Sequence, residues 1–216
     1  MTYNYVEFLK NKLIEASDAK KPQRTELQIE ISVASLLGEK AYHAITVDMI
    51  TERANIAHGT FYRYFDSKQG VVAKTIADYF DFVRATRPKI HGVSDLEAIT
   101  IGNRHYVRCF RENVGLMRCH FHLKDEDDRI AEVGRRADRA LSERIIGRLS
   151  RQHPIPEVAM PRLRLCTYAI IGMVDELLLK VYGQMDHPLV AYVDEPDMIA
   201  DTLTKLWYSA LADFRA

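Results

Sequence analysis

The 216-residue sequence lacks the features that define several protein classes. It has only three cysteines, Cys109, Cys119 and Cys166, which form no C-x-x-C pair, and their odd number argues against a set of structural disulfides. No segment approaches about 18 uninterrupted apolar residues, and no apolar run precedes a cleavage site near the start. These absences predict a protein of the reducing cytoplasm with no membrane partner.

Signatures of catalysis are also missing. The sequence contains no glycine-rich phosphate loop, nucleophile elbow, HExxH motif or prominent pair of carboxylates, so it predicts no catalytic residue, no cofactor and no enzyme. Imidazole and thiolate groups are good metal ligands, and five occur close together in the sequence: His105, Cys109, Cys119, His120 and His122. No pair of them has the sequence spacing of a known closed metal site. Structural or pocket-lining roles are therefore expected, and no metal site is predicted.

Charge is balanced over the whole chain. Lysine plus arginine and aspartate plus glutamate each number 30, which by itself argues slightly against a nucleic-acid partner. Between Arg53 and Lys68, however, basic residues outnumber acidic ones three to one. Because affinity for phosphate depends on where charge lies, a local basic surface on a neutral protein is sufficient.

Residues 45–74 carry the clearest structural pattern. Thr46 can cap a helix that begins near Val47, and Asp48 places negative charge at the positive end of that helix. Asn55 tolerates the left-handed backbone of a tight turn, and a second helix begins at once. Phe61 and Phe65, four residues apart, form the inward side of this second helix.

The outward side of the second helix is small, aromatic and cationic. It consists of His58, Gly59, Thr60, Tyr62, Arg63 and Tyr64, and no carboxylate occurs before Asp66. Two helices joined in this way form a helix-turn-helix, whose second helix enters the major groove of DNA.

These residues resemble a known family. The run from Gly59 to Phe65, followed by Asp66, Ser67 and Lys68, is similar to the recognition helix and following turn of TetR-family transcriptional regulators (TetR/AcrR type). The segments 37–42 and 45–50 fit as well, and the resemblance covers about residues 24–76. It implies an all-α fold with an N-terminal three-helix helix-turn-helix DNA-binding domain and a larger C-terminal helical domain for ligand binding and dimerisation.

The resemblance also implies which side chains meet DNA. The matching positions are Thr46, Thr60, Tyr62, Tyr64 and Lys68. Thr46 and Tyr62 offer hydroxyls to phosphates, Lys68 offers charge, and the residues nearest the base edges are His58, Gly59, Thr60 and Arg63. The alternative for Tyr62 and Tyr64 is packing beneath the helix.

A basic group of Lys20, Lys21 and Arg24 is either a solvated link or an arm that reaches DNA beside the major groove.

Three regions follow from the pattern along the chain. Residues 1–21 form an extension helix, with Val6, Leu9, Leu13 and Ala16 on one stripe, and a basic connector. Residues 22–86 form the DNA-binding domain, which includes a linking helix over 67–86. Proline and glycine in 87–93 mark the boundary to an effector-binding and dimerisation domain over 87–216.

Apolar spacing predicts how the helices of the DNA-binding domain face its core. The first long helix, about 22–42, turns one stripe inward: Leu27, Ile31, Ala34, Leu37 and Ala41. The linking helix turns another: Val72, Ile76, Phe80 and Val83. Ser67 can cap the linking helix, and Ser94 with Glu97 forms a capping box for the helix that opens the second domain.

The last two helices, residues 161–183 and 197–214, are apolar on more than one face and therefore need a second partner. The resemblance implies that this partner is the same pair in a second copy, which makes a homodimer and predicts a palindromic DNA site.

The resemblance also implies a small-molecule effector in the C-terminal domain. By position Tyr106, Phe110, Met117, Phe121, Tyr168 and Met173 line its site, and their mostly apolar character suits an apolar ligand.

The predicted function is a sequence-specific DNA-binding regulator, most simply a repressor that the ligand releases from its operator. Two alternatives stay open at this stage. One is a transcriptional activator of the same fold, and the other is a helical DNA-organising or interaction protein without an effector.

Overall fold

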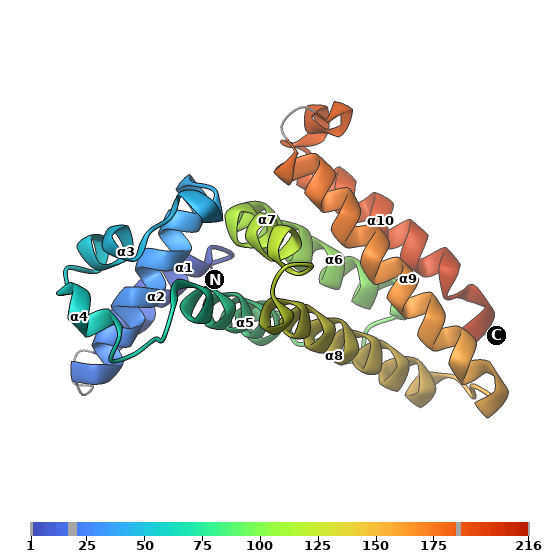
Figure 1. Ribbon diagram of the computed structural model, residues 1–216. Helices are drawn as coiled ribbons and strands as arrows, with labels where there is room; N and C mark the ends of the chain where they lie inside the picture. Colours follow the sequence, from blue (N-terminus) through green and yellow to red (C-terminus); the bar gives the residue numbers. More distant parts are fainter. Residues whose placement is uncertain (1, 17–20, 185–186, 216) are drawn as a thin grey trace. The chain divides into compact units, whose positions relative to one another are not determined.

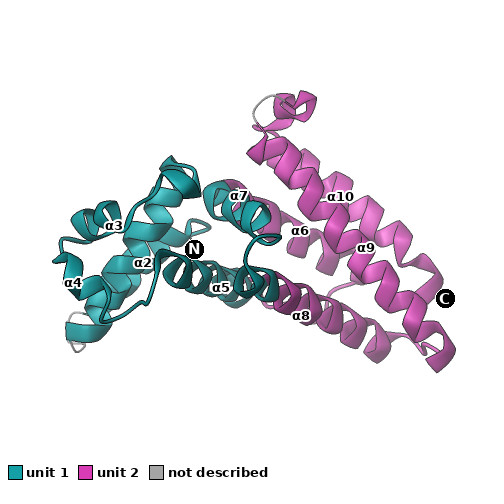
Figure 2. Ribbon diagram, in the orientation of Figure 1, with its two compact units in different colours: residues 1–86, 112–133 teal, residues 87–111, 134–216 magenta. Residues whose placement is uncertain are grey.

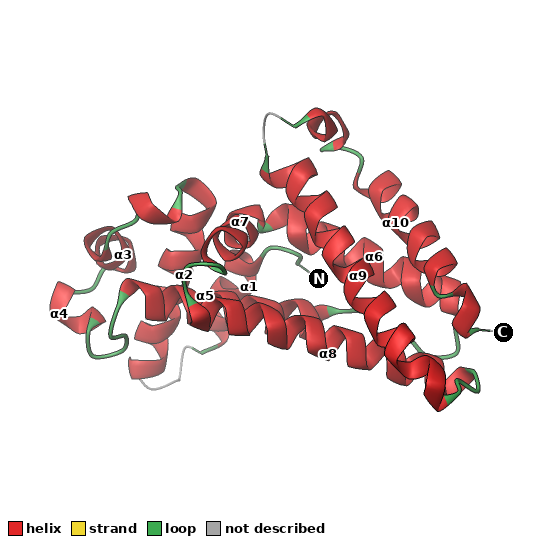
Figure 3. Cartoon of the chain, turned by 45° about the vertical axis from the view of Figure 1, so that its right-hand side comes forward, coloured by secondary structure: helices red, strands yellow, loops and turns green. Residues whose placement is uncertain are grey.

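The computed structural model describes residues 2–16, 21–184 and 187–215, which form helices and loops and no strand (Figures 1 and 3). The all-α prediction is confirmed. No helix in these ranges is both long enough and apolar enough to span a membrane. In order, the elements are α1 (Tyr5–Glu15), α2 (Lys21–Glu39), η1 (Tyr42–Ala44), α3 (Val47–Ala54), α4 (His58–Phe61), α5 (Lys68–Thr86), α6 (Asp95–Glu112), α7 (Val114–Leu123), α8 (Asp128–Gln152), η2 (Glu157–Ala159), α9 (Met160–Leu178), η3 (Leu179–Gly183), η4 (Pro188–Tyr192), α10 (Pro196–Ala210) and η5 (Ala212–Phe214).

The chain divides into two compact units (Figure 2). Unit 1 contains residues 1–86 and 112–133, and unit 2 contains residues 87–111 and 134–216. The break after Thr86 falls where proline and glycine mark a boundary in the sequence. Residues 112–133, which sequence spacing placed with the C-terminal part, pack with the N-terminal part instead, so α7 belongs to the unit that carries the helix-turn-helix.

The central helix of unit 1 is α2. Leu27, Ala34 and Leu37 are buried as predicted, whereas Ile31 is half-buried. Ala41 is exposed because the helix ends at Glu39, two residues earlier. Four helices, α1, α3, α5 and α7, pack against α2. They also bury side chains outside the predicted stripe: Ile29, Val33 and Leu36. A helix enclosed in this way has no single apolar stripe.

The extension helix α1 completes the core of unit 1. Asn4 caps it by accepting a hydrogen bond from the Glu7 N–H at 3.0 Å. Leu9 is buried as predicted, but the predicted Val6 and Leu13 are only half-buried and Ala16 lies beyond the helix end. Tyr5 is the other buried residue of the helix, and its ring packs against aromatic rings of α5.

The packing of α1 also changes the inward side of α5. Val72 and Ile76 are buried as predicted, whereas Phe80 and Val83 are only half-buried. Tyr79 and Phe82 are buried in their place, with ring centroids 5.8 Å and 5.4 Å from that of Tyr5. Ser67 caps α5 as predicted by accepting a hydrogen bond from the Gly70 N–H at 3.0 Å.

A close approach of two backbones fixes α7 on α2. A Cβ atom added at Gly115 would lie 2.2 Å from the Leu37 carbonyl oxygen and 2.7 Å from the Gly38 Cα. Only glycine permits this approach, because both obstructing atoms are backbone. The preceding residue, Asn113, is buried and accepts a hydrogen bond from the Tyr5 N–H at 2.7 Å, while its amide donates to the Tyr3 carbonyl at 2.7 Å.

Unit 1 also buries a carboxylate. Glu30 of α2 is 3% exposed and forms a hydrogen-bonded ion pair with Lys74 of α5. Burial raises the pKa of the Glu30 carboxyl, and the neighbouring Lys74 ammonium opposes that rise. Lys74 also pairs with Asp78 at 2.7 Å. Removing Lys74 would leave a buried charge without its partner, so this group fixes how α2 and α5 meet.

In unit 2, α6 begins with the predicted capping box. The Glu97 N–H donates to the Ser94 hydroxyl at 3.3 Å, and the Ser94 N–H donates to the Glu97 carboxylate at 3.0 Å. Farther along α6, three arginines pair with aspartates on and before α10 at 3.0–3.1 Å: Arg104 with Asp201, Arg108 with Asp197 and Arg111 with Asp194. These pairs are exposed and each stabilises the unit by about 1 kcal/mol at most.

We expect Gly115→Ala to lower the free energy of unfolding by about 1–3 kcal/mol, because the added methyl group meets backbone that cannot rotate away. Urea unfolding followed by circular dichroism measures this change. Gly147→Ala, also in a helix, is the matched control, since its Cβ would meet only the tip of Arg151 at 3.5 Å. Equal stability of the two variants would contradict the close approach of α7 to α2.

Candidate nucleic-acid interface

The first helix of the candidate interface, α3, is set by local hydrogen bonds. Thr46 caps it as predicted, and its hydroxyl accepts from the Met49 N–H at 3.2 Å. Asn55 ends it in a left-handed conformation with φ 53°. The next residue, Ile56, donates its N–H to the Thr51 carbonyl at 3.0 Å, which closes the helix end and turns the chain into α4.

The second helix, α4, is shorter than the sequence pattern predicts. It is helical only from His58 to Phe61, and the chain continues as a turn in which the Tyr64 N–H donates to the Phe61 carbonyl at 2.9 Å. Phe61 and Phe65 are buried as predicted, with ring centroids 5.8 Å apart. These two rings fix both ends of the segment, so the residues between them are held at the surface.

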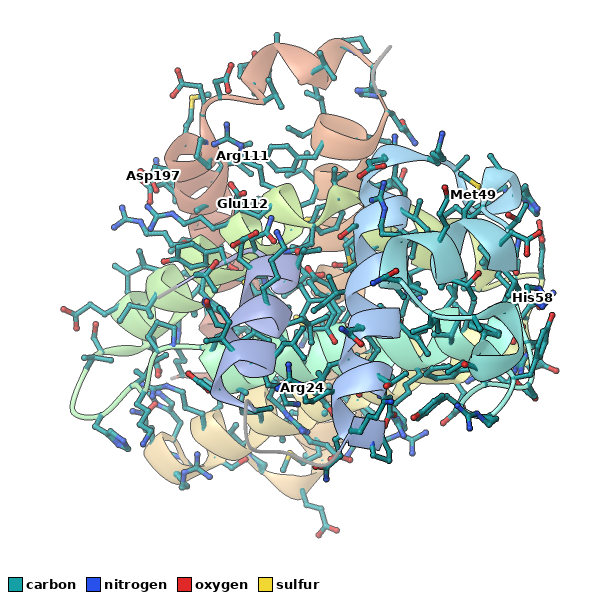
Figure 4. All side chains as sticks on the ribbon, turned by 90° about the vertical axis from the view of Figure 1, so that its left-hand side faces the viewer. Arg24, Met49, His58, Arg111, Glu112 and Asp197 are labelled. Atoms are coloured by element: carbon teal, nitrogen blue, oxygen red, sulfur yellow. The ribbon has the colours of Figure 1, made fainter. Side chains whose placement is uncertain are left out.

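The structure exposes most of the residues predicted to meet DNA. His58, Gly59 and Arg63 are exposed and Tyr62 is 52% exposed, whereas Thr60 and Tyr64 are half-buried. Figure 4 shows the His58 side chain at the outer surface of α4. We call the exposed surface of residues 58–64 the reading face. No carboxylate lies within this segment of the sequence.

One carboxylate of α3 does approach the reading face. Asp48, predicted only as a favourable charge at the start of α3, lies with its Oδ1 3.2 Å from the Nε2 of His58. The His58 ring also meets the Tyr62 ring edge-on at 5.3 Å between centroids. His58 is therefore oriented by both helices of the motif. Sequence spacing gave no signal of this contact, because Asp48 and His58 lie ten positions apart on different helices and the turn decides how the helices meet.

Lys68 has a structural role beside its predicted contact with phosphate. Its Nζ donates to the carbonyls of Tyr42 at 3.2 Å and Ile45 at 2.8 Å, and it lies 4.1 Å from the centre of the Tyr42 ring. An ammonium has three N–H donors, so these two bonds still allow one bond to a phosphate. Partial burial lowers the pKa of the Lys68 ammonium.

The predicted basic arm is described only in part. Lys21 is the first residue of α2 and is exposed, and Arg24 follows one turn later and is half-buried. Lys20 lies outside the described residues. The arm therefore stays a prediction.

The six residues predicted to line an effector site lie in different parts of the fold. Tyr106 and Phe110 are on α6 in unit 2, and the Tyr106 hydroxyl donates to Asp175 of α9 at 2.6 Å. Met117 and Phe121 are on α7 in unit 1. The last two, Tyr168 and Met173, are each 37% exposed on α9. Of the four predicted residues in unit 2, Phe110 is therefore fully buried and Tyr106 half-buried.

The histidines and cysteines singled out in the sequence also separate. The Cys109 thiol lies 3.6 Å from the Nε2 of His105 inside unit 2, and His120 is buried in unit 1. One of the five, His122, does converge among the described residues with two other possible metal ligands, His43 and Glu126. The spacing of His122 and Glu126, four residues apart, is a signal that sequence reasoning passed over.

The geometry defines a class of protein. Two short helices joined by a left-handed turn, a buried aromatic pair and an outward segment without a carboxylate of its own form a helix-turn-helix, a motif of DNA-binding proteins. Residues 34–75 match the model of "Bacterial regulatory proteins, tetR family". The helix-turn-helix segment of the chain is accordingly similar to this family of transcriptional regulators.

Solved structures show the same fold over most of the chain. A tetR-family transcriptional regulator from Streptomyces coelicolor has a TM-score of 0.70 at 13% identity, over 88% of this chain and 83% of that one. GusR from Salmonella enterica has a TM-score of 0.69 at 14% identity, over 91% of this chain and 100% of GusR. FadR from Bacillus halodurans, a fatty acid degradation regulator, has a TM-score of 0.59 at 20% identity, over 82% of this chain and 96% of FadR. No curated protein sequence matches the chain.

Burial of His120 makes unit 1 sensitive to acid. Desolvation lowers the pKa of His120 to about 4, its Nδ1 has no hydrogen-bond partner among the described residues, and its ring meets that of Phe80 edge-on at 5.3 Å. An unfolded chain takes up the proton near pH 6.5, so stability is present above that pH and is lost as the pH falls toward 4.

We expect acidification from pH 7 to pH 5 to cost the natural protein about 2 kcal/mol more of its free energy of unfolding than it costs His120→Gln. Urea unfolding of both proteins at the two pH values isolates the contribution of His120 to the free energy of unfolding, because both proteins contain the same carboxylates. Parallel pH dependence in the two proteins would show that His120 is not the responsible group.

Proposed function

We propose that the protein is a cytoplasmic repressor that binds a palindromic operator as a homodimer and leaves it when a small, largely apolar ligand binds. The observation that carries the DNA-binding part is the reading face, which presents an imidazole, a phenol and a guanidinium to solvent without a carboxylate in its own segment. Such a surface is suited to both phosphates and base edges.

Each exposed group has a proposed role on DNA. Thr46 and Tyr62 donate hydroxyl hydrogen bonds to phosphates, and Lys68 adds its remaining N–H to the same backbone. Arg63 is suited to the two acceptors of guanine in the major groove, a contact that discriminates by about 1–3 kcal/mol. The smaller residues of α4, Gly59 and Thr60, let the backbone approach the bases, with His58 beside them.

The proposed dimer surface is an exposed apolar stripe on α9. Leu165 is 72% exposed, Tyr168 and Met173 are each 37% exposed, and Ala169 and Gly172 lie between them at helical spacing. On α10, Leu206 is 45% exposed and Tyr208 is 38% exposed. Contiguous apolar surface of this kind marks an interaction site. Two copies related by a two-fold axis would cover the same stripe on each other.

For the effector, the interior of unit 2 offers a better candidate than the exposed face of α9. Phe110 is fully buried, and its ring centroid lies 6.2 Å from that of Tyr106 and 6.4 Å from that of Tyr182. The Tyr182 hydroxyl is buried without a hydrogen-bond partner among the described residues. A buried hydroxyl in that state costs about 1–3 kcal/mol, which a polar atom of an otherwise apolar ligand would recover.

The proposed release acts through the spacing of the two reading faces. Ligand binding would shift α5, which follows the reading face directly, and the two faces of a dimer would no longer match the fixed spacing of DNA. A coupling of about 1–3 kcal/mol is sufficient to change occupancy by fivefold or more. An identical separation of the reading faces with and without an active ligand would overturn this mechanism.

Selection of bound fragments from genomic DNA tests the DNA-binding proposal. The natural protein should enrich a palindromic sequence, and Arg63→Ala should bind that sequence about 5- to 150-fold more weakly, with relaxed preference at one base pair of each half-site. Tyr62→Phe should weaken binding to all sequences alike, because it removes only a phosphate contact.

Arg136→Ala is the matched control, since Arg136 is an exposed arginine of α8 in unit 2. It should enrich the same sequence with unchanged affinity. Failure of the natural protein to enrich any sequence even at low salt would refute the proposal, and enrichment unaffected by Arg63→Ala would refute the role of the reading face.

Introducing carboxylates into the apolar stripe of α9 tests the proposed dimer surface. Leu165→Glu with Met173→Glu should convert the dimer to a monomer, measured by sedimentation or light scattering, because two copies would bury four carboxylates without partners. Val158→Glu is the matched control, since Val158 is 88% exposed in η2, outside the stripe. A dimer that persists in the double variant would place the interface elsewhere.

A further inference from the structure

Three potential metal ligands lie together on the surface of unit 1. The Nε2 atoms of His43 and His122 are 3.1 Å apart, and a Glu126 carboxylate oxygen lies within 4.8 Å of both. All three residues are exposed, so the packing of the core does not force these side chains together. Two imidazole nitrogens at this distance cannot both carry a proton, so at least one lone pair points into the group.

The backbone holds these ligands from two sides. His43 is in η1, which is fixed by buried Tyr42 and by the two hydrogen bonds from Lys68. His122 is in the last turn of α7, and the chain continues as a turn in which the Glu126 N–H donates to the Leu123 carbonyl at 3.0 Å. Residues four apart in such a turn lie on one side of it, so His122 and Glu126 both face η1.

We propose that His43, His122 and Glu126 bind a divalent transition-metal ion of the zinc class, which links η1 to the end of α7. Two imidazoles and one carboxylate are the donor set that such ions prefer, whereas magnesium and calcium prefer oxygen ligands alone. Three protein ligands leave a fourth position for water or another small ligand.

The distances are compatible with this ion. Zinc binds histidine nitrogen and carboxylate oxygen at about 2.0–2.2 Å, which puts tetrahedral ligands about 3.3–3.6 Å from one another. The observed separations of 3.1 Å and up to 4.8 Å reach that range through small rotations of exposed side chains. Asp127, the next carboxylate along the chain, pairs with Arg129 at 3.1 Å and is therefore engaged elsewhere.

The position of the site gives the ion a consequence beyond local stability. η1 ends two residues before Thr46, the residue that caps α3 of the helix-turn-helix. α7 follows α6 of unit 2 after the single residue Asn113. A metal ion held between η1 and α7 would therefore join the start of the DNA-reading motif to the segment that leads directly into unit 2. Its binding would be an input separate from that of the apolar ligand.

Zinc titration of the metal-free full-length protein tests the site, with a chromophoric chelator as competitor. We expect one high-affinity ion per chain, visible absorption bands when cobalt replaces zinc, and a higher midpoint of thermal unfolding with zinc than without it. His43→Ala with His122→Ala should lower the affinity at least 100-fold and abolish the thermal shift. Glu126→Gln should lower the affinity about tenfold, and magnesium should not compete.

The matched controls are His91→Ala and Asp125→Asn, both exposed residues outside the group of three ligands, and they should bind zinc like the natural protein. Absence of zinc binding would overturn the proposal and leave a hydrogen-bonded histidine pair. Binding that survives in the double histidine variant but disappears in Cys166→Ser would overturn it as well. Because no measurement uses DNA, the result is independent of the proposed repressor function.

Discussion

The structure of unit 1 depends on the contact between the backbones of α7 and α2 at Gly115. Because the Leu37 carbonyl and the Gly38 Cα occupy the space of a side chain there, α7 can approach α2 this closely only with glycine at position 115. This approach brings Asn113 to the start of α1 and His122 to η1. The extension helix, the turn before the helix-turn-helix and α7 are thus tied to one another through a single close approach.

This arrangement makes the DNA-reading motif part of a larger rigid core than three helices would provide. α2 is covered on all sides, the Glu30–Lys74 ion pair joins it to α5, and the Lys68 ammonium holds the two ends of η1. A change in α5 or α7 therefore reaches the reading face through packed contacts rather than through a flexible link. Such contacts are the physical basis on which a bound ligand or ion can bias DNA binding.

Local patterns predicted much of the fold and part of the site. Thr46, Ser67 and the Ser94–Glu97 box cap helices where the sequence placed them, because a cap involves only the next three residues. The burial of Phe61 and Phe65 and the exposure of Tyr62 also follow from spacing alone. Spacing failed for α5, where Tyr79 and Phe82 replace Phe80 and Val83 in the core, because α1 covers a side of the helix that apolar periodicity leaves open.

The sequence by itself determined the all-helical class and the helix-turn-helix with its resemblance to the TetR family, since each is written in contiguous residues whose hydrogen bonds and apolar spacing are local. Only the tertiary structure decided that α7 packs with the N-terminal unit, that Lys68 holds η1, that Asp48 reaches His58 and that His43, His122 and Glu126 meet. Most of these contacts join residues more than 20 positions apart in the chain. Their partners are chosen by the packing of whole helices, which the period of a single helix does not encode.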